Sequence, residues 1–360
     1  MTHNLAAALP RVPRTCFFEI TRACNLRCLH CWHGDEAGGS AELDAAEALD
    51  AADQLAAAGC LQVRLTGGEP LLREDWPAIA RRFAARGVEV VVITNGTLVD
   101  DGAVAELKAA GVSRVAVSID GEREVHDEIR VPAGRTSRTS RFDAAVRAVE
   151  RLSRAGIPTT AITQIHKRNA RRLKAVHDVA VAAGADTWQV QLAMPLGRLL
   201  DLRYEYLVDV DDLPRIQAAL ARLVDGGEVR VVVTDNIGYY GPHEAKLRGA
   251  DGRGVPFFAG CQAGCGVVAV CADGTVKGCP SHPASFAMGS LRRERFAAIW
   301  DDAGRFPYNT AFREEHLEGG CKRCAYRRVC RAGCTTMAFA ATGTIFDNPF
   351  CALRAEAGEE

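Results

Sequence analysis

Apolar runs that predict strands alternate with Ala-rich amphipathic stretches that predict helices, from Thr15 to about residue 235. Six such units with short connections are typical of a parallel sheet with helices outside it. Since the strands are apolar on both faces, we expect the sheet to be buried on both sides. The predicted strands are Cys16–Thr21, Leu61–Thr66, Val88–Thr94, Arg114–Ile119, Pro158–Ile165 and Thr187–Met194.

The predicted helices each end at a glycine, which supplies the left-handed turn after the last helical residue. The first begins at a capping box formed by Asp44 and Glu47 and ends at Gly59. Six strand–helix units could close part of a barrel or form an open doubly wound sheet, and periodicity alone leaves both open. The other predicted helices are Trp76–Arg86, Asp101–Ala110, Arg141–Ala155 and Ala170–Ala183.

The alternation stops after Val233, and the rest of the chain differs in character. Residues 236–260 predict a linker or loop. From Cys261 the chain is rich in Cys and Gly, with a strand–turn–strand pattern around Ala272–Gly274 and a helix near Leu291–Trp300. We therefore expect an α/β core domain at 14–235 and a second domain at 261–354.

Composition narrows the class of protein. The 360 residues, 48% apolar and 25% charged, are enough for a sizeable core and about two domains. Lys and Arg total 44 against 45 Asp and Glu, which gives no electrostatic reason to expect nucleic acid or an anionic membrane as a partner. No apolar run approaches the roughly 18 residues that span a bilayer, and Leu5–Leu9 is short for a signal peptide. The sequence therefore predicts a soluble cytoplasmic protein.

Cysteine is the unusual residue, with fourteen in the chain. The cytosol keeps thiols reduced, so clustered cysteines there indicate metal sites or catalysis rather than disulfides. Three lie near the start of the chain, and nine lie between Cys261 and Cys351. Cys16 and Cys60 stand at strand entries, where we expect core residues.

The first cluster, Cys24-x3-Cys28-x2-Cys31, directly follows the first predicted strand. In barrel-like α/β folds such a loop lies at the face where chemistry is placed. Three thiolates can hold a cubane iron–sulfur cluster with one iron open to another ligand. The alternative is a zinc loop that His30 or His33 completes.

This spacing, with His30 at an aromatic-type position before the last cysteine, resembles the signature of the radical SAM superfamily. The resemblance covers residues 14–235 and implies a partial (β/α)6 TIM-like barrel. It also implies a 4Fe–4S cluster whose open iron binds S-adenosylmethionine (SAM). One electron from that cluster then cleaves SAM to methionine and a 5′-deoxyadenosyl radical.

Short motifs at the next strand ends resemble the SAM site of that family, in the same order. In Gly67-Gly68-Glu69, glycines permit close approach of the backbone to a ligand, and the Glu69 carboxylate can accept hydrogen bonds from the SAM ammonium group. The adenine is expected near Gln191–Met194. The other SAM contacts that the resemblance implies are Asn95, Ser118, Asp120 and Arg130, with Arg135, Arg138 and Arg141 competing with Arg130.

The C-terminal cysteines resemble the SPASM extension, a domain that holds two further 4Fe–4S clusters. Three cubanes, one with an open iron, need about eleven thiolates. The first cluster supplies three and the C-terminal motif supplies seven, which are Cys261, Cys279, Cys321, Cys324, Cys330, Cys334 and Cys351. Cys265 is favoured over Cys271 as the eleventh, because Cys271 falls inside a predicted strand where a buried small hydrophobe is expected. The resemblance implies one auxiliary cluster on Cys261, Cys265, Cys279 and Cys334 and another on Cys321, Cys324, Cys330 and Cys351. A zinc ribbon is the alternative for the stretch Cys321–Cys334.

The architecture implies oxidation of C–H bonds, mostly in peptides or proteins. Pro280 follows Cys279 where sulfatase-maturating enzymes of the family have an aspartate base, so maturation of a ribosomally made peptide is favoured over that activity. Heme- or quinone-cofactor biosynthesis is the other alternative within the family. The resemblance implies a flavodoxin- or ferredoxin-type electron donor. Because about fifteen residues precede the first strand, a separate leader-binding protein would present a peptide substrate, or the enzyme would bind it without one.

A hypothesis from another class is a non-enzymatic iron–sulfur electron carrier or a zinc-bound scaffold. It explains the cysteines but leaves Gly67-Gly68-Glu69 and the other strand-end motifs without purpose. The sequence indicates no general base. Substrate contacts, with a solvated polar loop as the alternative, are expected at Asp235, Asn236, Tyr239, Tyr240, His243 and Glu244.

Overall fold

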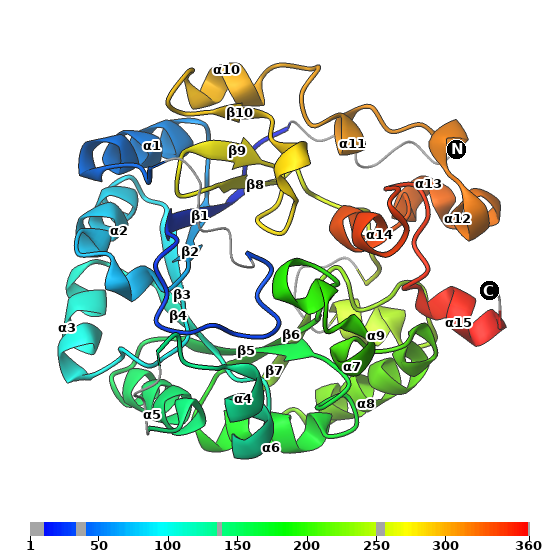
Figure 1. Ribbon diagram of the computed structural model, residues 1–360, viewed down its shortest axis with the longest axis horizontal. Helices are drawn as coiled ribbons and strands as arrows, with labels where there is room; N and C mark the ends of the chain where they lie inside the picture. Colours follow the sequence, from blue (N-terminus) through cyan, green and yellow to red (C-terminus); the bar gives the residue numbers. More distant parts are fainter. Residues whose placement is uncertain (1–10, 34–40, 135–138, 250–255, 359–360) are drawn as a thin grey trace.

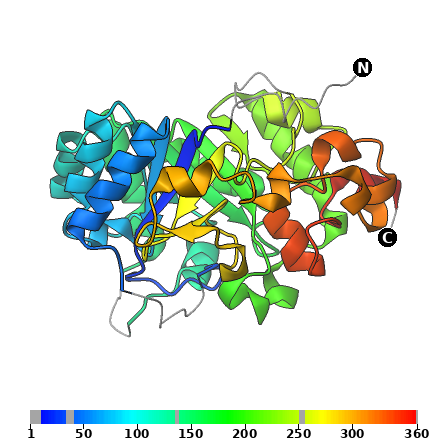
Figure 2. The same cartoon turned by 90° about the horizontal axis from the view of Figure 1, so that it is seen from above.

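The computed structural model describes residues 11–33, 41–134, 139–249 and 256–358. Ten strands of this described chain form one sheet in the order β10-β9-β8-β1-β2-β3-β4-β5-β6-β7, which curves around a central space (Figure 1, Figure 2). The strands are β1 Thr15–Thr21, β2 Gln62–Gly67, β3 Glu89–Thr94, β4 Arg114–Ser118, β5 Thr159–Ile165, β6 Thr187–Leu192, β7 Arg230–Val233, β8 Val267–Val270, β9 Thr275–Lys277 and β10 Gly289–Ser290.

Helices cover the outer side of the curved sheet (Figure 1). Those of the barrel are α1 Ala45–Ala57, α2 Trp76–Ala85, α3 Asp101–Ala109, α4 Arg123–Ile129, α5 Arg141–Arg154, α6 Leu173–Ala182, α7 Arg203–Tyr206 and α8 Leu213–Gly226. Those of the remaining chain are α9 Glu244–Gly249, α10 Phe296–Trp300, α11 Pro307–Thr310, α12 Gly319–Arg323, α13 Arg327–Cys330, α14 Thr335–Thr342 and α15 Ala352–Ala357.

The predicted barrel is confirmed. All six predicted strands are present and pair in parallel from β1 to β6. The capping box of α1 is also present, since the Asp44 carboxylate accepts from the Glu47 N–H at 2.8 Å and the Glu47 carboxylate from the Asp44 N–H at 2.9 Å. The structure adds a seventh parallel strand, β7, which the sequence reading missed because only four residues of it are extended.

The Cys-rich part of the chain is built onto the barrel rather than merely attached to it. Strand β8 pairs in parallel with β1, with Phe18 opposite Val270, and β9 and β10 continue the sheet in antiparallel pairs. The predicted linker is also part of the fold, because it contains α9 and the buried residues Ile237 and Tyr239. The second group of thiols is therefore fixed relative to the barrel opening.

Successive side chains along each strand point to opposite faces of the sheet, so the two faces contact different surroundings. Phe18, Leu65 and Val92 point outward into the main core between sheet and helices, while Val91, Ala116 and Ile162 form a small apolar cluster of their own. Cys16 and Cys60 are 0% and 4% exposed, which confirms them as core residues. Among the described residues, no helix combines the length and apolar character that crossing a membrane requires.

Candidate active site

A cavity of about 650 Å³ lies at the carboxyl ends of the first five strands, and Cys24, Cys28 and Cys31 form part of its wall. These thiols stand on the loop after β1, which crosses the middle of the barrel in Figure 1. Burial raises the pKa of Cys28 to about 12, against the opposing effect of the nearby Arg130 guanidinium and with a smaller contribution from Cys31. Without metal the thiol therefore keeps its proton, which iron binding would displace. Three converging thiols at an open cavity fit a cubane with one open iron.

Gly67 and Gly68 form a close backbone contact below this loop. Gly67 has φ +140°, and a Cβ there would lie 2.0 Å from the Thr21 carbonyl oxygen; a Cβ on Gly68 would lie 2.2 Å from that of Ala23. The Gly68 N–H donates to the Thr21 oxygen at 2.7 Å. Only glycines permit this approach. Both glycines line the cavity, as expected of residues that cradle a ligand.

Glu69 makes its contacts from a buried position at the end of β2. It is fully buried and does not belong to the described cavity wall. Its carboxylate accepts from the Thr94 hydroxyl at 2.7 Å and from the Asn95 N–H at 2.8 Å, and burial raises its pKa to about 7. The Asn95 amide in turn donates to Asn25 at 2.8 Å. Glu69 thus ties the end of β3 to the cysteine loop, and a direct contact with SAM stays a prediction.

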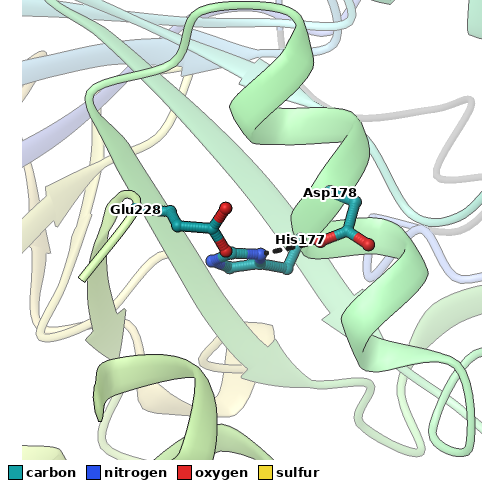
Figure 3. A group of neighbouring side chains, drawn as sticks. All are labelled: His177, Asp178 and Glu228. Atoms are coloured by element: carbon teal, nitrogen blue, oxygen red, sulfur yellow. Dashed lines mark hydrogen bonds and ion pairs between the residues drawn. The ribbon is translucent and has the colours of Figure 1, made fainter. Parts of the chain in front are cut away.

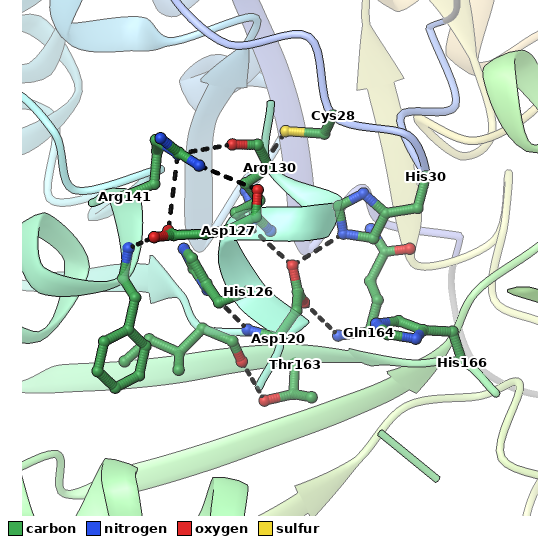
Figure 4. Close-up of polar contacts among 12 residues, drawn as sticks. Cys28, His30, Asp120, His126, Asp127, Arg130, Arg141, Thr163, Gln164 and His166 are labelled. Atoms are coloured by element: carbon green, nitrogen blue, oxygen red, sulfur yellow. Dashed lines mark hydrogen bonds and ion pairs between the residues drawn. The ribbon is translucent and has the colours of Figure 1, made fainter. Parts of the chain in front are cut away.

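Asp120 organises the cavity wall beside Cys28 (Figure 4). One carboxylate oxygen accepts from Arg130 Nε at 2.7 Å and contacts His30 Nε2 at 2.9 Å, while the other accepts from the Gln164 N–H at 2.9 Å. Burial alone would raise the pKa of Asp120, but Arg130 and His30 hold it well below its usual range. Asp120 is therefore a carboxylate, and it fixes Arg130 with Nη1 4.0 Å from the Cys28 sulfur.

Of the arginines considered for the SAM carboxylate, Arg130 lines the cavity, together with Ser118. Its competitor Arg141 instead donates to the carbonyl oxygens of Arg130 and Asp127 and so supports the backbone. Arg135 and Arg138 lie outside the described residues. The segment Gln191–Met194, expected near the adenine, is not in the described wall, so that contact stays a prediction.

The wall also contains residues that the sequence reading missed, among them Arg27, Trp32, Gln164 and Arg198. Arg198 reaches the loop from beyond β6 and donates to the Cys28 carbonyl oxygen at 3.0 Å. Its sequence separation from Cys28 left no local signal for this contact. Gln164 could have been found, because it is a polar residue near the end of a predicted strand.

The contacts of His30 and His33 do not favour the alternative of a zinc site completed by one of these histidines. His30 Nε2 contacts Asp120, and His33 Nε2 accepts from the Trp32 indole at 3.0 Å and lies 3.4 Å from Glu19. Both rings are oriented by these partners rather than by the thiols.

Eight of the C-terminal cysteines lie in two groups of four. Cys321, Cys324, Cys330 and Cys351 line one small pocket. In the other group, Cys261 raises the pKa of Cys265, Cys279 and Cys334 after the larger effect of burial, which shows that these thiols are neighbours. Cys271 instead interacts with Glu19 and Lys277. This placement favours Cys265 as the remaining ligand, although the ligand assignment itself stays a prediction.

His282 makes the stability of the fold sensitive to pH. It is buried, and burial, aided by the Lys277 ammonium, lowers its pKa to about 3. The unfolded chain protonates histidine near pH 6.5, so stability from the neutral ring is complete above that pH and is lost as pH falls toward 3. We expect His282→Phe to reduce the loss of unfolding free energy between pH 7.5 and pH 5 by about 2 kcal/mol. Anaerobic denaturant titrations at the two pH values measure it.

The matched control for this change is His316→Phe, at a half-buried ring. It should leave the difference between the two pH values unchanged. If His282→Phe shows the same loss as the unchanged chain, burial of this ring does not contribute to acid sensitivity.

The six expected substrate contacts are not in the described cavity wall. Several are buried structural residues rather than parts of a solvated loop. The Asn236 amide accepts from and donates to the backbone of Leu192, and the Tyr239 hydroxyl accepts from the Cys334 N–H at 2.7 Å. The Glu244 carboxylate accepts from the Phe258 N–H at 2.8 Å. The Tyr239 contact joins the segment after β7 to the group of Cys261, Cys265, Cys279 and Cys334.

A separate group of potential metal ligands, His177, Asp178 and Glu228, lies on the outer layer at α6 and before β7 (Figure 3). Both oxygens of Asp178 accept from the Lys174 ammonium group at 2.8 Å. The ion pair with Lys174 explains the position of the Asp178 carboxylate without a metal. Asp178 and Glu228 are also exposed to solvent. We assign no metal to this group.

Comparison with known proteins agrees with this geometry. Residues 18–180 match the radical SAM superfamily, and residues 261–325 match the SPASM iron–sulfur cluster-binding domain. The AdoMet-dependent heme synthase of Methanosarcina barkeri is 34% identical over 96% of this chain and 98% of its own length. The chain belongs to the radical SAM superfamily. As a radical SAM protein with a SPASM domain and relatives named synthases and maturases, it is an enzyme that uses SAM and iron–sulfur clusters.

Two further likenesses concern peptide-modifying proteins. The mycofactocin maturase MftC of Mycobacterium tuberculosis is 30% identical over 92% of this chain and 80% of its own length. The crystal structure of Streptococcus suis SuiB bound to precursor peptide SuiA superposes with a TM-score of 0.71 at 14% identity, covering 95% of this chain and 76% of that one. At that identity the likeness to SuiB shows the radical SAM and SPASM fold alone.

Proposed function

We propose that this radical SAM enzyme oxidises an iron porphyrin that carries propionate side chains, on the route to heme. The observation that carries the proposal is the charge of the cavity wall. Arg22, Arg27, Arg130 and Arg198 line it, and its described residues include no Asp or Glu. The carboxylates that pair with two of these arginines, Asp273 with Arg22 at 2.8 Å and Asp120 with Arg130 at 2.7 Å, lie outside the wall. Guanidinium groups are the side chains best suited to bind carboxylates. The heme synthase of Methanosarcina barkeri, similar over nearly its whole length, supports the same substrate class.

The residues at the cavity fit the cofactors that this reaction needs. Cys24, Cys28 and Cys31 would hold the SAM-binding cluster, and the two C-terminal thiol groups would hold two more, three in all. When bound, the first cluster supplies the electron that cleaves SAM to a 5′-deoxyadenosyl radical. The chain's own part is to position and to exclude water. Gly67 and Gly68 permit close approach of SAM, and Asp120 aims Arg130 toward its carboxylate.

The chemistry of the substrate explains why additional redox centres are useful. A propionate becomes a vinyl group when it loses one hydrogen atom, one carbon dioxide and one electron. The 5′-deoxyadenosyl radical takes the hydrogen atom, and the electron needs a separate acceptor. The SPASM thiols belong to the part of the chain that β8 fixes to β1, and they would hold that acceptor.

Anaerobic turnover tests the proposal. The reconstituted enzyme, with SAM and dithionite, is incubated with iron coproporphyrin, which has four propionates where heme has two and two vinyl groups. We expect 5′-deoxyadenosine and a porphyrin product whose mass has fallen by one carboxyl group and one hydrogen per step, measured by liquid chromatography and mass spectrometry. Formation of 5′-deoxyadenosine with unchanged porphyrin would reject this substrate.

A second candidate is oxidative modification of a ribosomally made peptide. The similarity to mycofactocin maturase favours it, as does the fold shared with SuiB, a protein solved with its precursor peptide. A separate leader-binding protein would then present the peptide. In the same assay, a peptide encoded beside the gene would change mass while the porphyrin would not. Sulfatase maturation is disfavoured by Pro280, which cannot act as a base.

A further inference from the structure

A basic surface with an aromatic centre lies over the group of Cys321, Cys324, Cys330 and Cys351. We call it the α12–α13 surface and define it by the exposed residues Lys322, Arg323, Tyr326, Arg328 and Val329. It stands at the outer edge of the molecule, on the side opposite α2 and α3, in both views (Figure 1, Figure 2). It is therefore well separated from the helices that cover the first strands.

The charge of this surface is incompletely neutralised. Within the described chain, neither Lys322 nor Arg323 forms an ion pair. Arg327 and Arg328 share one carboxylate, Glu314, at 3.0 Å and 2.5 Å. One acid between two guanidinium groups leaves a net positive charge, which attracts an acidic partner over about 10 Å at moderate ionic strength.

The centre of the surface is apolar and rigid. The Tyr326 ring stacks on the Tyr240 ring with centroids 4.0 Å apart, and the Tyr240 hydroxyl donates to the Phe258 carbonyl oxygen. Tyr326 is still 43% exposed and Val329 40% exposed. An apolar aromatic centre with a charged rim is the usual composition of a protein-binding site.

Thiols lie directly beneath this surface. Cys324 is partly exposed, and its sulfur accepts from the Tyr326 N–H at 3.4 Å. Cys321, Cys324, Cys330 and Cys351 converge on one pocket with Tyr240 and Arg327 in its wall. A cluster held by these four thiols would therefore be separated from a docked protein by about one side chain, a separation favourable for electron transfer.

We propose that the α12–α13 surface docks an acidic one-electron carrier protein of the flavodoxin type. This carrier, in its oxidised form, takes from the enzyme the single electron that substrate oxidation releases, and is itself reduced by one electron. The electron's origin rests on the proposed function, in which the substrate loses one hydrogen atom, one carbon dioxide and one electron. Docking through this surface depends only on its charge and shape.

The test uses the reconstituted holoenzyme and purified oxidised flavodoxin. The variant carries Lys322→Glu together with Arg323→Glu. We expect its affinity for flavodoxin at low salt to fall about tenfold, with a flatter salt dependence, because rim charges act through electrostatic attraction. Biolayer interferometry at two salt concentrations measures both effects.

A matched control reverses Lys108 and Arg81 to Glu. These residues are an exposed lysine and an exposed arginine on α3 and α2, so the total charge changes by the same amount on the opposite side of the molecule. Flavodoxin affinity of this control should stay within about twofold of the unchanged enzyme, since distant exposed charges are screened. Equal loss of affinity in both variants, or in neither, overturns the proposal.

A second readout needs no substrate. Enzyme reduced with dithionite and freed of excess reductant is mixed with oxidised flavodoxin, and flavin absorbance follows electron transfer. The α12–α13 variant should be slower, while its SAM cleavage with dithionite and its iron content stay unchanged. If flavodoxin binding behaves as expected but iron coproporphyrin is not consumed, docking stands and the proposed substrate fails. A normal transfer rate in the variant overturns docking whatever the substrate.

Discussion

Replacing Cys28 with Ala should abolish SAM cleavage. The Cys28 sulfur lies 4.0 Å from Arg130 Nη1, and Cys28 lines the cavity together with Cys24 and Cys31. With two thiolates left, a cubane is no longer held by three irons, and bound iron should fall by about four per chain. We expect 5′-deoxyadenosine formation with dithionite to drop at least about 10³-fold, the scale seen when a group that the reaction requires is removed. Chromatography of the nucleoside and iron analysis measure the two effects.

The control for this prediction is Cys324→Ala, in the group of Cys321, Cys324, Cys330 and Cys351. Cys324 lies at the α12–α13 surface, outside the described cavity wall, so SAM cleavage should remain while substrate oxidation is lost. Normal cleavage by the Cys28 variant would contradict the assignment of the first cluster. Loss of cleavage in both variants would mean that the two sites are not independent.

The thiol loop and the strand ends could be predicted from sequence because their information is local. Cys24, Cys28 and Cys31 lie within one loop, and Gly67-Gly68 directly follows a run of apolar residues. A parallel sheet brings its strand ends to one edge, so order along the chain becomes proximity in space. The structure accordingly places Gly67, Gly68, Asn95 and Ser118 around one cavity.

Contacts between distant segments could not be predicted in this way. Nothing in residues 267–270 indicates that β8 pairs with β1, because a short apolar strand fits many partners. The same applies to Arg198, whose contact with Cys28 depends on the path of the chain after β6. For the segment from Asn236 to Glu244, the sequence predicts substrate contacts or a solvated polar loop, because the buried hydrogen-bond partners of these residues are far away in sequence.

Residue type did not indicate how deeply two carboxylates at the strand ends are buried. Glu69 and Asp120 follow strands at the cavity edge, where exposed acids would contact a ligand directly. Both are fully buried instead, and each holds neighbouring groups in place. Whether a polar residue contacts the ligand or supports a residue that does depends on side-chain packing, which the spacing of motifs does not contain.

The largest stability effect is expected for Asp120→Asn. The substitution keeps the side-chain shape but removes the only carboxylate that pairs with Arg130 among the described residues, at 2.7 Å. Arg130 is 8% exposed and would become an uncompensated buried charge, which costs about 3–5 kcal/mol. For a chain of this size that corresponds to a melting temperature lower by about 4–7 °C, measured by anaerobic thermal denaturation.

Two comparisons separate this effect from a general loss of packing. Asp127→Asn changes a partly exposed carboxylate 3.6 Å from Arg141 and should cost no more than about 1 kcal/mol. Adding Arg130→Gln to Asp120→Asn removes the unpaired charge, so the double variant should be less destabilised than the sum of the two single variants. Since Arg130 also lines the cavity, SAM affinity should fall in all three Asp120 and Arg130 variants but not in Asp127→Asn. Additive destabilisation would show that the buried charge of Arg130 does not depend on Asp120.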